Sequence, residues 1–315
     1  MTLPAYLVVG GAGFIGSRLV TRLVERGEVT VVDDHSSGRA ELHDAAVADG
    51  RCELRVGSVL DSELLLSAMR GKTAVFHLSA NPEARRGLSQ PRLDLEQGTL
   101  ATHAVLDAMR AASVERVVLA SSGTVYGVAD KSCREGDLGA LPISLYGASK
   151  LASEALLSAH VECFGISAWI FRLGNVIGPR ATHGAAVDFL HRLQQEPERL
   201  TVLGDGGQSK PYLHVADCVD AMLFGFEHAA EPLNVFNVAP EGGTSVRALA
   251  ELCVARSPNP RAQIVYSGGQ RGWLGDVPCS RLDASALARL GYTLPRSSDE
   301  AVALGVQELA QEIFG

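Results

Sequence analysis

The amino-acid sequence predicts an α/β fold, in which a doubly wound parallel sheet is followed by a smaller, mainly helical C-terminal domain. The first observation is that short apolar runs alternate with helix-patterned segments up to about residue 175. The second is that these runs are apolar on both faces, which is typical of parallel strands covered by helices on both sides. The third is that the alternation loosens after residue 175, where Gly- and Pro-rich stretches separate isolated helices.

The predicted strands and helices follow one another in a regular order. Residues 5–11 form an apolar run that ends in glycines, which predicts a buried first strand. Residues 14–27 show the helical spacing of apolar side chains and end at Gly27, a common helix stop. By the same criteria, the further strands are 29–34, 53–58, 74–80, 116–122, 167–173 and 234–239. The further helices are 61–71, 100–113, 149–165, 186–195 and 246–257.

These elements predict two domains. Residues 1–174 carry the alternating pattern and form the first domain. Residues 208–240 return to it, because 234–239 is predicted as one more strand of the same sheet. Residues 175–207 and 241–315 form the second domain. The length of 315 residues is ordinary for such an arrangement.

Composition excludes several classes of function. With a net charge of −8 and no long basic run, the chain is not expected to bind nucleic acid. Its apolar runs are too short for a membrane span, and the N-terminal segment lacks the basic leader of a secretory signal, so we expect a cytoplasmic protein. Six cysteines without a Cys-x-x-Cys pair predict buried or half-buried free thiols in a reducing compartment. Nine scattered histidines predict no metal site.

A glycine motif joins the first predicted strand to the first helix. Gly10, Gly13 and Gly16 are spaced as G-x-x-G-x-x-G, which allows a tight turn and a close backbone approach to a pyrophosphate at the helix N-terminus. Asp33, at the end of the second strand, is placed to hold the ribose hydroxyls of NAD and to repel the 2′-phosphate of NADP. The pattern therefore predicts a Rossmann-type domain that binds NAD. Two alternatives stay open: Asp33 could merely end its strand, and Arg39 could accept a 2′-phosphate.

The segment SLYGASK places Tyr146 and Lys150 four residues apart, which is one turn on a helix. A free phenol has a pKa of about 10 and is a poor base at neutral pH, but a neighbouring ammonium lowers that pKa. Tyr146 could therefore act as a general base that Lys150 activates. Such a pair also arises by chance in many helices, so its meaning depends on the rest of the chain.

Several motifs occur in a fixed order along the chain. They are the glycine motif, HLSAN (77–81), SSGTVYG (121–127), SLYGASK (144–150), FRLGNVIGP (171–179), KPYLHVADCVDAM (210–222) and RGWLGDVP (271–278). Together they closely resemble the extended short-chain dehydrogenase/reductase family, and within it the nucleotide-sugar 4-epimerases of the UDP-glucose 4-epimerase type. The resemblance covers nearly the whole chain.

The resemblance implies a mechanism. Tyr146 takes the proton of the sugar 4-hydroxyl while the hydrogen on C4 leaves as hydride to NAD. Lys150 lowers the pKa of Tyr146 and holds the nicotinamide ribose. Ser122 hydrogen-bonds the reacting sugar oxygen, and Thr124 assists. The 4-ketosugar then turns over about its diphosphate link and takes the hydride back on its other face, so NAD is regenerated. Tyr126 is a rival base, but no lysine follows it by four residues.

The resemblance also assigns residues to the two ligands. Beyond the glycines, Asp33, Tyr146 and Lys150, the implied NAD contacts are Phe14, Ile15, Ser58, Val59, Leu78 and Ala80. Ser58 stands where relatives usually carry an aspartate. The implied UDP-sugar contacts are Arg85, Ser122, Tyr146, Asn175, Lys210 and Arg271. Two alternatives stay open. Ser122 could instead cap the end of its strand, and Lys210 or Arg271 could instead be a solvated surface charge. On this basis the second domain binds the substrate, and the protein is expected to be a homodimer.

Other functions share this fold. Arg85 with Arg86, or Arg180, could bind a carboxylate, so a UDP-glucuronate 4-epimerase stays open. UDP-glucuronate decarboxylases and 4,6-dehydratases usually carry an acidic residue in the serine-threonine segment, where this chain has Gly123 and Thr124. A non-catalytic NAD-sensing protein would often lack the Tyr–Lys pair, which is intact here. We therefore expect an enzyme, an NAD-dependent epimerase that acts at C4 of a UDP-hexose.

Overall fold

The computed structural model describes residues 3–38, 47–137 and 141–315 of the chain. The chain forms two compact units, each built from separate segments. The first unit comprises Met1–Ser121, Ala148–Phe171 and Met222–Phe236, and the second comprises Ser122–Gly147, Arg172–Ala221 and Asn237–Gly315. The predicted domain limits differ from these units mainly at 122–147 and 208–221, which both belong to the second unit.

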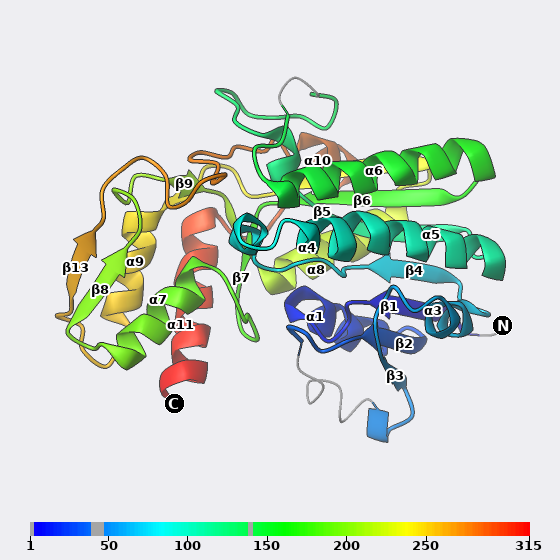
Figure 1. The fold of residues 1–315 in the computed structure, drawn as a ribbon, viewed down its shortest axis with the longest axis horizontal. Coiled ribbons are helices and arrows are strands. Elements are labelled where there is room, and N and C mark those ends of the chain that lie inside the picture. The colour runs from blue at the N-terminus through cyan, green and yellow to red at the C-terminus, as the bar shows by residue number, and fades with distance from the viewer. Residues whose placement is uncertain (1–2, 39–46, 138–140) are drawn as a thin grey trace. The chain divides into compact units, whose positions relative to one another are not determined.

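The first unit is built around a seven-stranded sheet in the order β11-β6-β5-β4-β1-β2-β3 (Figure 1). Its strands are Ala5–Val9 (β1), Glu28–Asp33 (β2), Cys52–Val56 (β3), Ala74–His77 (β4), Arg116–Ser122 (β5), Ser167–Leu173 (β6) and Leu233–Val238 (β11). The pairs β1–β2, β2–β3, β1–β4 and β4–β5 are parallel. Each strand coincides with a predicted one to within a few residues, so the predicted parallel sheet is confirmed.

One face of this sheet carries an apolar core. Leu7 of β1, Val75 of β4 and Ile170 of β6 belong to a buried cluster that also contains side chains of three helices. These helices are Ser62–Met69 (α3), Ala101–Ala112 (α5) and Leu145–Phe164 (α6). The strand residues in the cluster alternate along each strand, because successive side chains of a strand point to opposite faces.

Two further helices cover the opposite face. Phe76 of β4 and Trp169 of β6 contact Phe226 of α8 (Val215–His228), with ring centroids 5.1 and 5.0 Å away. Arg26, just after α1 (Phe14–Leu23), forms an ion pair with Glu227 of α8. Helices therefore cover both faces, as the doubly wound prediction requires.

The second unit contains short strands as well as helices. Three two-stranded sheets pair Asn175–Ile177 (β7) with Tyr212–His214 (β10), Ser209–Lys210 (β9) with Thr244–Ser245 (β12), and Arg199–Val202 (β8) with Gln263–Tyr266 (β13). Its helices include Ala185–Gln195 (α7), Val246–Ala255 (α9), Ser285–Leu290 (α10) and Ser298–Phe314 (α11). The sequence predicted α7 and α9 but none of these strands, because two to four residues are too few for a strand pattern.

Short helical segments lie outside the longer helices of the sheet and of the second unit. Ala84–Leu88 (η2) is a 3₁₀ turn, and Arg92–Asp94 (α4) leads through a π-helical turn, Leu95–Leu100 (η3), into α5. Gly123–Tyr126 (η4) is a 3₁₀ turn at the end of β5.

All six cysteines are free thiols. Cys163 is exposed near the end of α6, so the prediction that every cysteine would be buried or half-buried is wrong at this position. Within the described ranges, no helix is both long and apolar enough to cross a membrane. The same residues hold no cluster of three or more His, Cys, Asp or Glu side chains that could bind a metal ion.

Candidate active site

The glycine motif forms the turn between β1 and α1. A Cβ atom on Gly16 would lie 2.2 Å from the carbonyl oxygen of Gly10, so only glycine lets α1 begin this close to the end of β1. Gly10 itself has a φ of +79°, a conformation that favours glycine. A Cβ on Gly13 would have one neighbour within 4 Å, the carbonyl oxygen of Gly10 at 3.3 Å. The turn is therefore open beside Gly13.

The N-terminus of α1 has donors to offer an anion. Gly13 is its N-cap residue and has no side chain to bond the amides of the first turn, which also contains no acidic residue. The first amides of a helix have no partner within the helix, and its dipole favours negative charge there. The open turn and the uncapped amides together fit the pyrophosphate of a dinucleotide such as NAD.

Asp33 ties the glycine turn to the end of β2. One carboxylate oxygen accepts the amide of Ala12 at 2.9 Å and the other accepts that of His35 at 2.8 Å. Each oxygen has a further lone pair, so the carboxylate can still accept from ribose hydroxyls. This arrangement supports the predicted NAD contact. Arg39, the alternative partner for a 2′-phosphate, lies outside the described residues.

The remaining predicted NAD contacts all lie in the first unit. Phe14 and Ile15 begin α1, and the amide of Leu78 extends the pairing of β1 with β4 through the carbonyl of Val9 at 2.8 Å. Ser58 is exposed, and its hydroxyl oxygen accepts the amide of Leu60 at 3.2 Å. The Ser58 hydroxyl can still donate its hydrogen to a base. Val59 packs partly against the core, and Ala80 is half-buried.

Lys150 is buried in α6, with 4% of its surface exposed. Its ammonium donates to the carbonyl oxygen of Ala120 on β5 at 2.7 Å. Desolvation lowers the pKa of Lys150 to about 8, while the negative charges of Glu154 and Asp94 act to raise it. Lys150 therefore keeps its positive charge near neutral pH but loses it at moderately alkaline pH.

Tyr146 lies one turn before Lys150, because α6 begins at Leu145 and not at residue 149 as predicted. The early start is stabilised by Ser144, whose hydroxyl accepts the amide of Gly147 at 3.1 Å. A Cβ on Gly147 would lie 2.9 Å from the carbonyl oxygen of Thr124, so a glycine is needed for α6 to start beside η4. The segment of Tyr146 and the segment of Thr124 are thus neighbours.

Ser122 and Thr124 form a pair of hydroxyls at the start of η4. The Ser122 hydroxyl oxygen accepts the Thr124 amide at 3.2 Å and the Thr124 hydroxyl at 3.0 Å. Ser122 thus caps η4, and its own hydroxyl hydrogen can still bond a ligand oxygen. The cap predicted as an alternative role and the predicted ligand contact are compatible in this geometry.

Tyr126, the rival base, is unsuited to proton transfer. Its buried hydroxyl donates to the Asn237 side chain at 2.8 Å and accepts from Arg172 at 2.7 Å. Burial raises the pKa of Tyr126 to about 12, against the opposing effect of Arg172 and Asn237. Tyr126 therefore anchors the end of η4, and Tyr146 is left as the candidate base.

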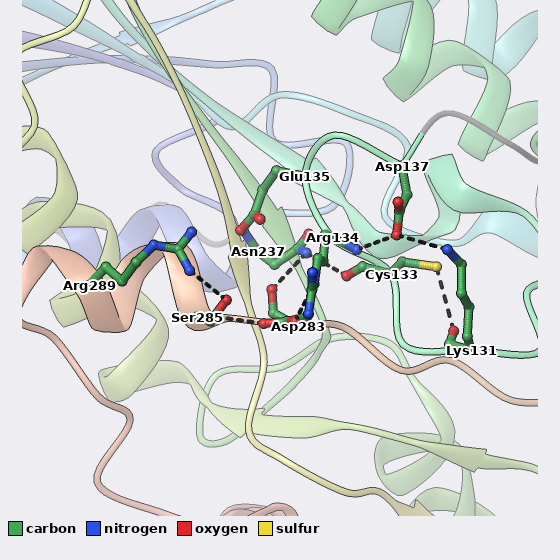
Figure 2. A network of polar contacts seen from close by, with 9 residues as sticks. All are labelled: Lys131, Cys133, Arg134, Glu135, Asp137, Asn237, Asp283, Ser285 and Arg289. Carbon is green, nitrogen blue, oxygen red and sulfur yellow. Dashed lines mark hydrogen bonds and ion pairs between the residues drawn. The ribbon is translucent and has the colours of Figure 1, made fainter.

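Figure 2 shows how Asn237 joins the segment after η4 to a later part of the chain. Its side-chain amide donates to the carbonyls of Cys133 at 2.9 Å and of Asp283 at 3.0 Å. Its backbone amide donates to Glu135 at 2.8 Å. At the outer edge of this network, Arg134 forms an ion pair with Asp283 at 2.9 Å. Residues 133–135, which follow η4 in the chain, are therefore held in place by Asn237 and Asp283.

Two of the predicted substrate contacts are linked by an acidic residue. Lys210 forms an ion pair with Asp276, whose other oxygen accepts the amide of Gly272 at 3.2 Å. Asp276 thereby brings Lys210 close to the segment that begins with the exposed Arg271. An ammonium has three donors, so Lys210 can bond a phosphate while it holds Asp276. Asn175 is exposed at the start of β7, and its side chain hydrogen-bonds the buried Tyr212, whose pKa burial raises to about 12.

Three arginines are the predicted contacts for a substrate carboxylate. Arg85 and Arg86 are exposed on η2, and Arg85 lies 3.8 Å from Glu83, a spacing worth little in solvent. Arg180 is half-buried in the second unit, and its backbone amide donates to Glu312 at 3.0 Å. These contacts leave the roles of the three arginines as predictions.

The sequence did not single out Asp276, Asn237 or Glu154. Asp276 lies within the motif RGWLGDVP, and Glu154 follows Lys150 by four residues, so spacing could have pointed to both. Asn237 had no local signal, because its partners lie far away in the sequence.

Comparisons with known proteins find similar sequences and similar folds over most of the chain. A profile of the NAD dependent epimerase/dehydratase family matches residues 6–239. A UDP-glucose 4-epimerase of Mycolicibacterium smegmatis is 35% identical over 288 residues, which cover 88% of this chain and 89% of the relative. A crystal structure of a UDP-galactose 4-epimerase has a TM-score of 0.86 at 36% identity and covers 98% of this chain and 99% of that one. The structure of MoeE5 in complex with UDP-glucuronic acid and NAD has a TM-score of 0.85 at 29% identity, with coverages of 98% and 99%.

Proposed function

The chain belongs to the NAD dependent epimerase/dehydratase family, and from this premise we propose that it inverts C4 of a UDP-hexose, interconverting UDP-glucose and UDP-galactose. The observation that carries the proposal is the position of Tyr146 and Lys150 one turn apart on α6, with the Ser122–Thr124 hydroxyl pair beside the start of that helix. A base, a cation and a hydroxyl pair are what proton removal from a sugar alcohol requires.

Each group has a distinct task in the proposed reaction. Tyr146 takes the proton of the 4-hydroxyl and later returns it, and the Lys150 charge makes the phenol acidic enough to do so at neutral pH. Ser122 holds the reacting oxygen, with Thr124 bonded behind it. NAD, when bound at the glycine turn and Asp33, would accept the hydride from C4 and later return it. Lys210 and Arg271 hold the diphosphate while the sugar turns.

A second candidate substrate is UDP-glucuronate, because Arg85 and Arg86 are adjacent guanidiniums and one is enough for a phosphate contact. MoeE5, a neighbour in structure, is described in complex with UDP-glucuronic acid. A carboxylate can take two parallel, charge-assisted bonds from a guanidinium, whereas the hydroxyls of a neutral hexose carry no opposite charge.

We expect purified protein to convert UDP-glucose to UDP-galactose, and incubation with UDP-glucose and UDP-glucuronate in separate reactions, followed by product separation, tests this. If Arg86 binds a carboxylate, Arg86→Ala will weaken turnover of UDP-glucuronate about tenfold to a hundredfold more than that of UDP-glucose, since a charge-assisted bond contributes roughly 1.5–3 kcal/mol. Arg92→Ala, at another exposed arginine, serves as the control. Equal losses for both sugars would leave the hexose as the substrate.

We also propose that the protein is a cytoplasmic homodimer whose second unit binds the UDP-sugar. Exposed apolar side chains support association: Leu88, Leu95 and Leu100 lie close together in the sequence and are 55%, 48% and 42% exposed. The six free thiols are in keeping with a reducing compartment. Sedimentation equilibrium at micromolar concentration is expected to give twice the chain mass of 33.2 kDa, and the monomer mass would contradict the proposal.

A further inference from the structure

Glu154 is a buried acid that the proposed reaction does not use. It is 5% exposed and lies on α6 four residues after Lys150, which itself lies four residues after Tyr146. Residues spaced by four share one face of a helix. Burial of a carboxylate is costly unless it is paired or hydrogen-bonded, so its position calls for a specific partner.

The charged groups of Lys150 and Glu154 form hydrogen bonds with two consecutive residues of strand β5. The Lys150 ammonium donates to the carbonyl of Ala120 at 2.7 Å, and the hydroxyl of Ser121 donates to the Glu154 carboxylate. Ser121 is 2% exposed, so this bond is also buried. The helix spacing and the two bonds to adjacent residues of β5 place the carboxylate next to the ammonium, inside the first unit.

The other titratable groups around Lys150 cannot replace Glu154. Asp94, in α4, is a weaker influence on Lys150, and burial raises the pKa of Asp94 itself. His77, in β4, is completely buried, and burial together with the Lys150 charge lowers its pKa to about 3, so it is neutral at physiological pH. Tyr146, on α6 itself, is the group whose phenolate the Lys150 charge stabilises in the proposed reaction, so it depends on that charge and cannot replace Glu154 as its source. Glu154 is therefore the main source of negative charge that opposes the desolvation of Lys150.

We propose that Glu154 is a positioning residue for the epimerase reaction: its carboxylate, fixed by Ser121, keeps the buried Lys150 in the charged form that Tyr146 requires. The proposal rests on the proposed function, because it assigns Glu154 a role through Lys150. A neutral amine would neither stabilise the phenolate of Tyr146 nor offer three donors to the ligand. Glu154 itself is not assigned any contact with the substrate or NAD.

The charge of Lys150 can be measured directly, because the chain has only four lysines, at 72, 131, 150 and 210. Lysine labelled with ¹³C at the ε carbon gives one titrating signal for each, and Lys150→Arg identifies the signal of Lys150. In NAD-saturated protein, Glu154→Gln is expected to lower the pKa of Lys150 by about one unit or more, the size of effect expected when a close opposite charge is lost. Glutamine keeps the size of the side chain and can still accept from Ser121.

The matched control is Glu162→Gln, which removes the same charge from an exposed position two turns further along α6. It is expected to leave the Lys150 titration unchanged. Glu154→Asp retains the charge and is expected to restore most of the pKa of Lys150. Circular dichroism checks that each variant is folded, and Glu154→Met, which keeps the side-chain length without a charge, provides the same measurement if the glutamine variant does not fold.

Activity provides the second measurement. In Glu154→Gln the alkaline fall of kcat should begin at lower pH than in the wild type, by the shift seen in the Lys150 titration, while KM for the UDP-sugar stays unchanged. An unchanged Lys150 titration in Glu154→Gln, or an equal shift in Glu162→Gln, would overturn the proposal. A shifted titration with an unmoved pH profile would also overturn it. If the wild type does not epimerise UDP-sugars, the proposed function fails, and the titration still decides whether Glu154 holds the charge of Lys150.

Discussion

Replacing Tyr146 by phenylalanine is expected to lower kcat by about 10²–10⁴-fold, the range that one general acid–base group contributes. The phenol is the group that the proposed reaction needs on α6, and its ring remains in the variant. Fold and NAD binding should stay intact, because the glycine turn and Asp33 are distant in the sequence and unaffected. Initial rates with UDP-glucose and calorimetric titration with NAD measure the two properties separately.

Tyr126→Phe is the matched control, since it also removes one phenol hydroxyl. It should cost far less turnover but destabilise the protein by about 1–3 kcal/mol, because the buried acceptor of Asn237 and the donor of Arg172 lose their partner. Urea unfolding measures this loss. Near-normal turnover in Tyr146→Phe, or a larger loss of turnover in Tyr126→Phe, would show that Tyr146 is not the base.

Gly16→Ala is expected to weaken NAD binding by about tenfold to a hundredfold, which corresponds to roughly 1–3 kcal/mol of backbone strain. The added Cβ would stand 2.2 Å from the carbonyl of Gly10 and 2.8 Å from the Cα of Gly11, both backbone atoms that cannot simply rotate away. The start of α1 must therefore move, and its amides lose the position that fits a pyrophosphate.

Gly136→Ala provides the comparison, because a Cβ there would meet no atom within 4 Å. It should bind NAD as the wild type does. The two variants are compared by calorimetry with NAD and by thermal unfolding. Unchanged NAD affinity in a folded Gly16→Ala protein would show that the turn does not hold the pyrophosphate.

Much of the fold could be predicted because its signals are local. The strands of the main sheet are continuous apolar runs, and the first helix follows a glycine turn whose spacing is written in adjacent residues. The spacing of Tyr146 and Lys150 is likewise local. The start of α6 was placed four residues too late, because it depends on Ser144 and on the close approach of Thr124 rather than on apolar periodicity.

The partners of the site residues were harder to predict because they are distant in the sequence. Lys210 pairs with Asp276 across 66 positions, and Ser121 bonds Glu154 across 33. No periodicity or composition in either segment signals its partner. The short strands β9 and β12 also depend on each other, since two residues form a strand only where another backbone lies alongside.

The anchor of η4 has a consequence for the order in which the protein is made. Tyr126 must wait for Asn237, 111 positions later, and a ribosome that adds about 5–20 residues per second needs roughly 6–22 seconds to supply it. Asp283, whose carbonyl accepts one of the bonds from the Asn237 side-chain amide, emerges later still. Tyr126 is therefore translated early but gains its partner late, and a nascent chain halted before Asn237 would carry the whole glycine turn while the end of η4 still lacks this anchor.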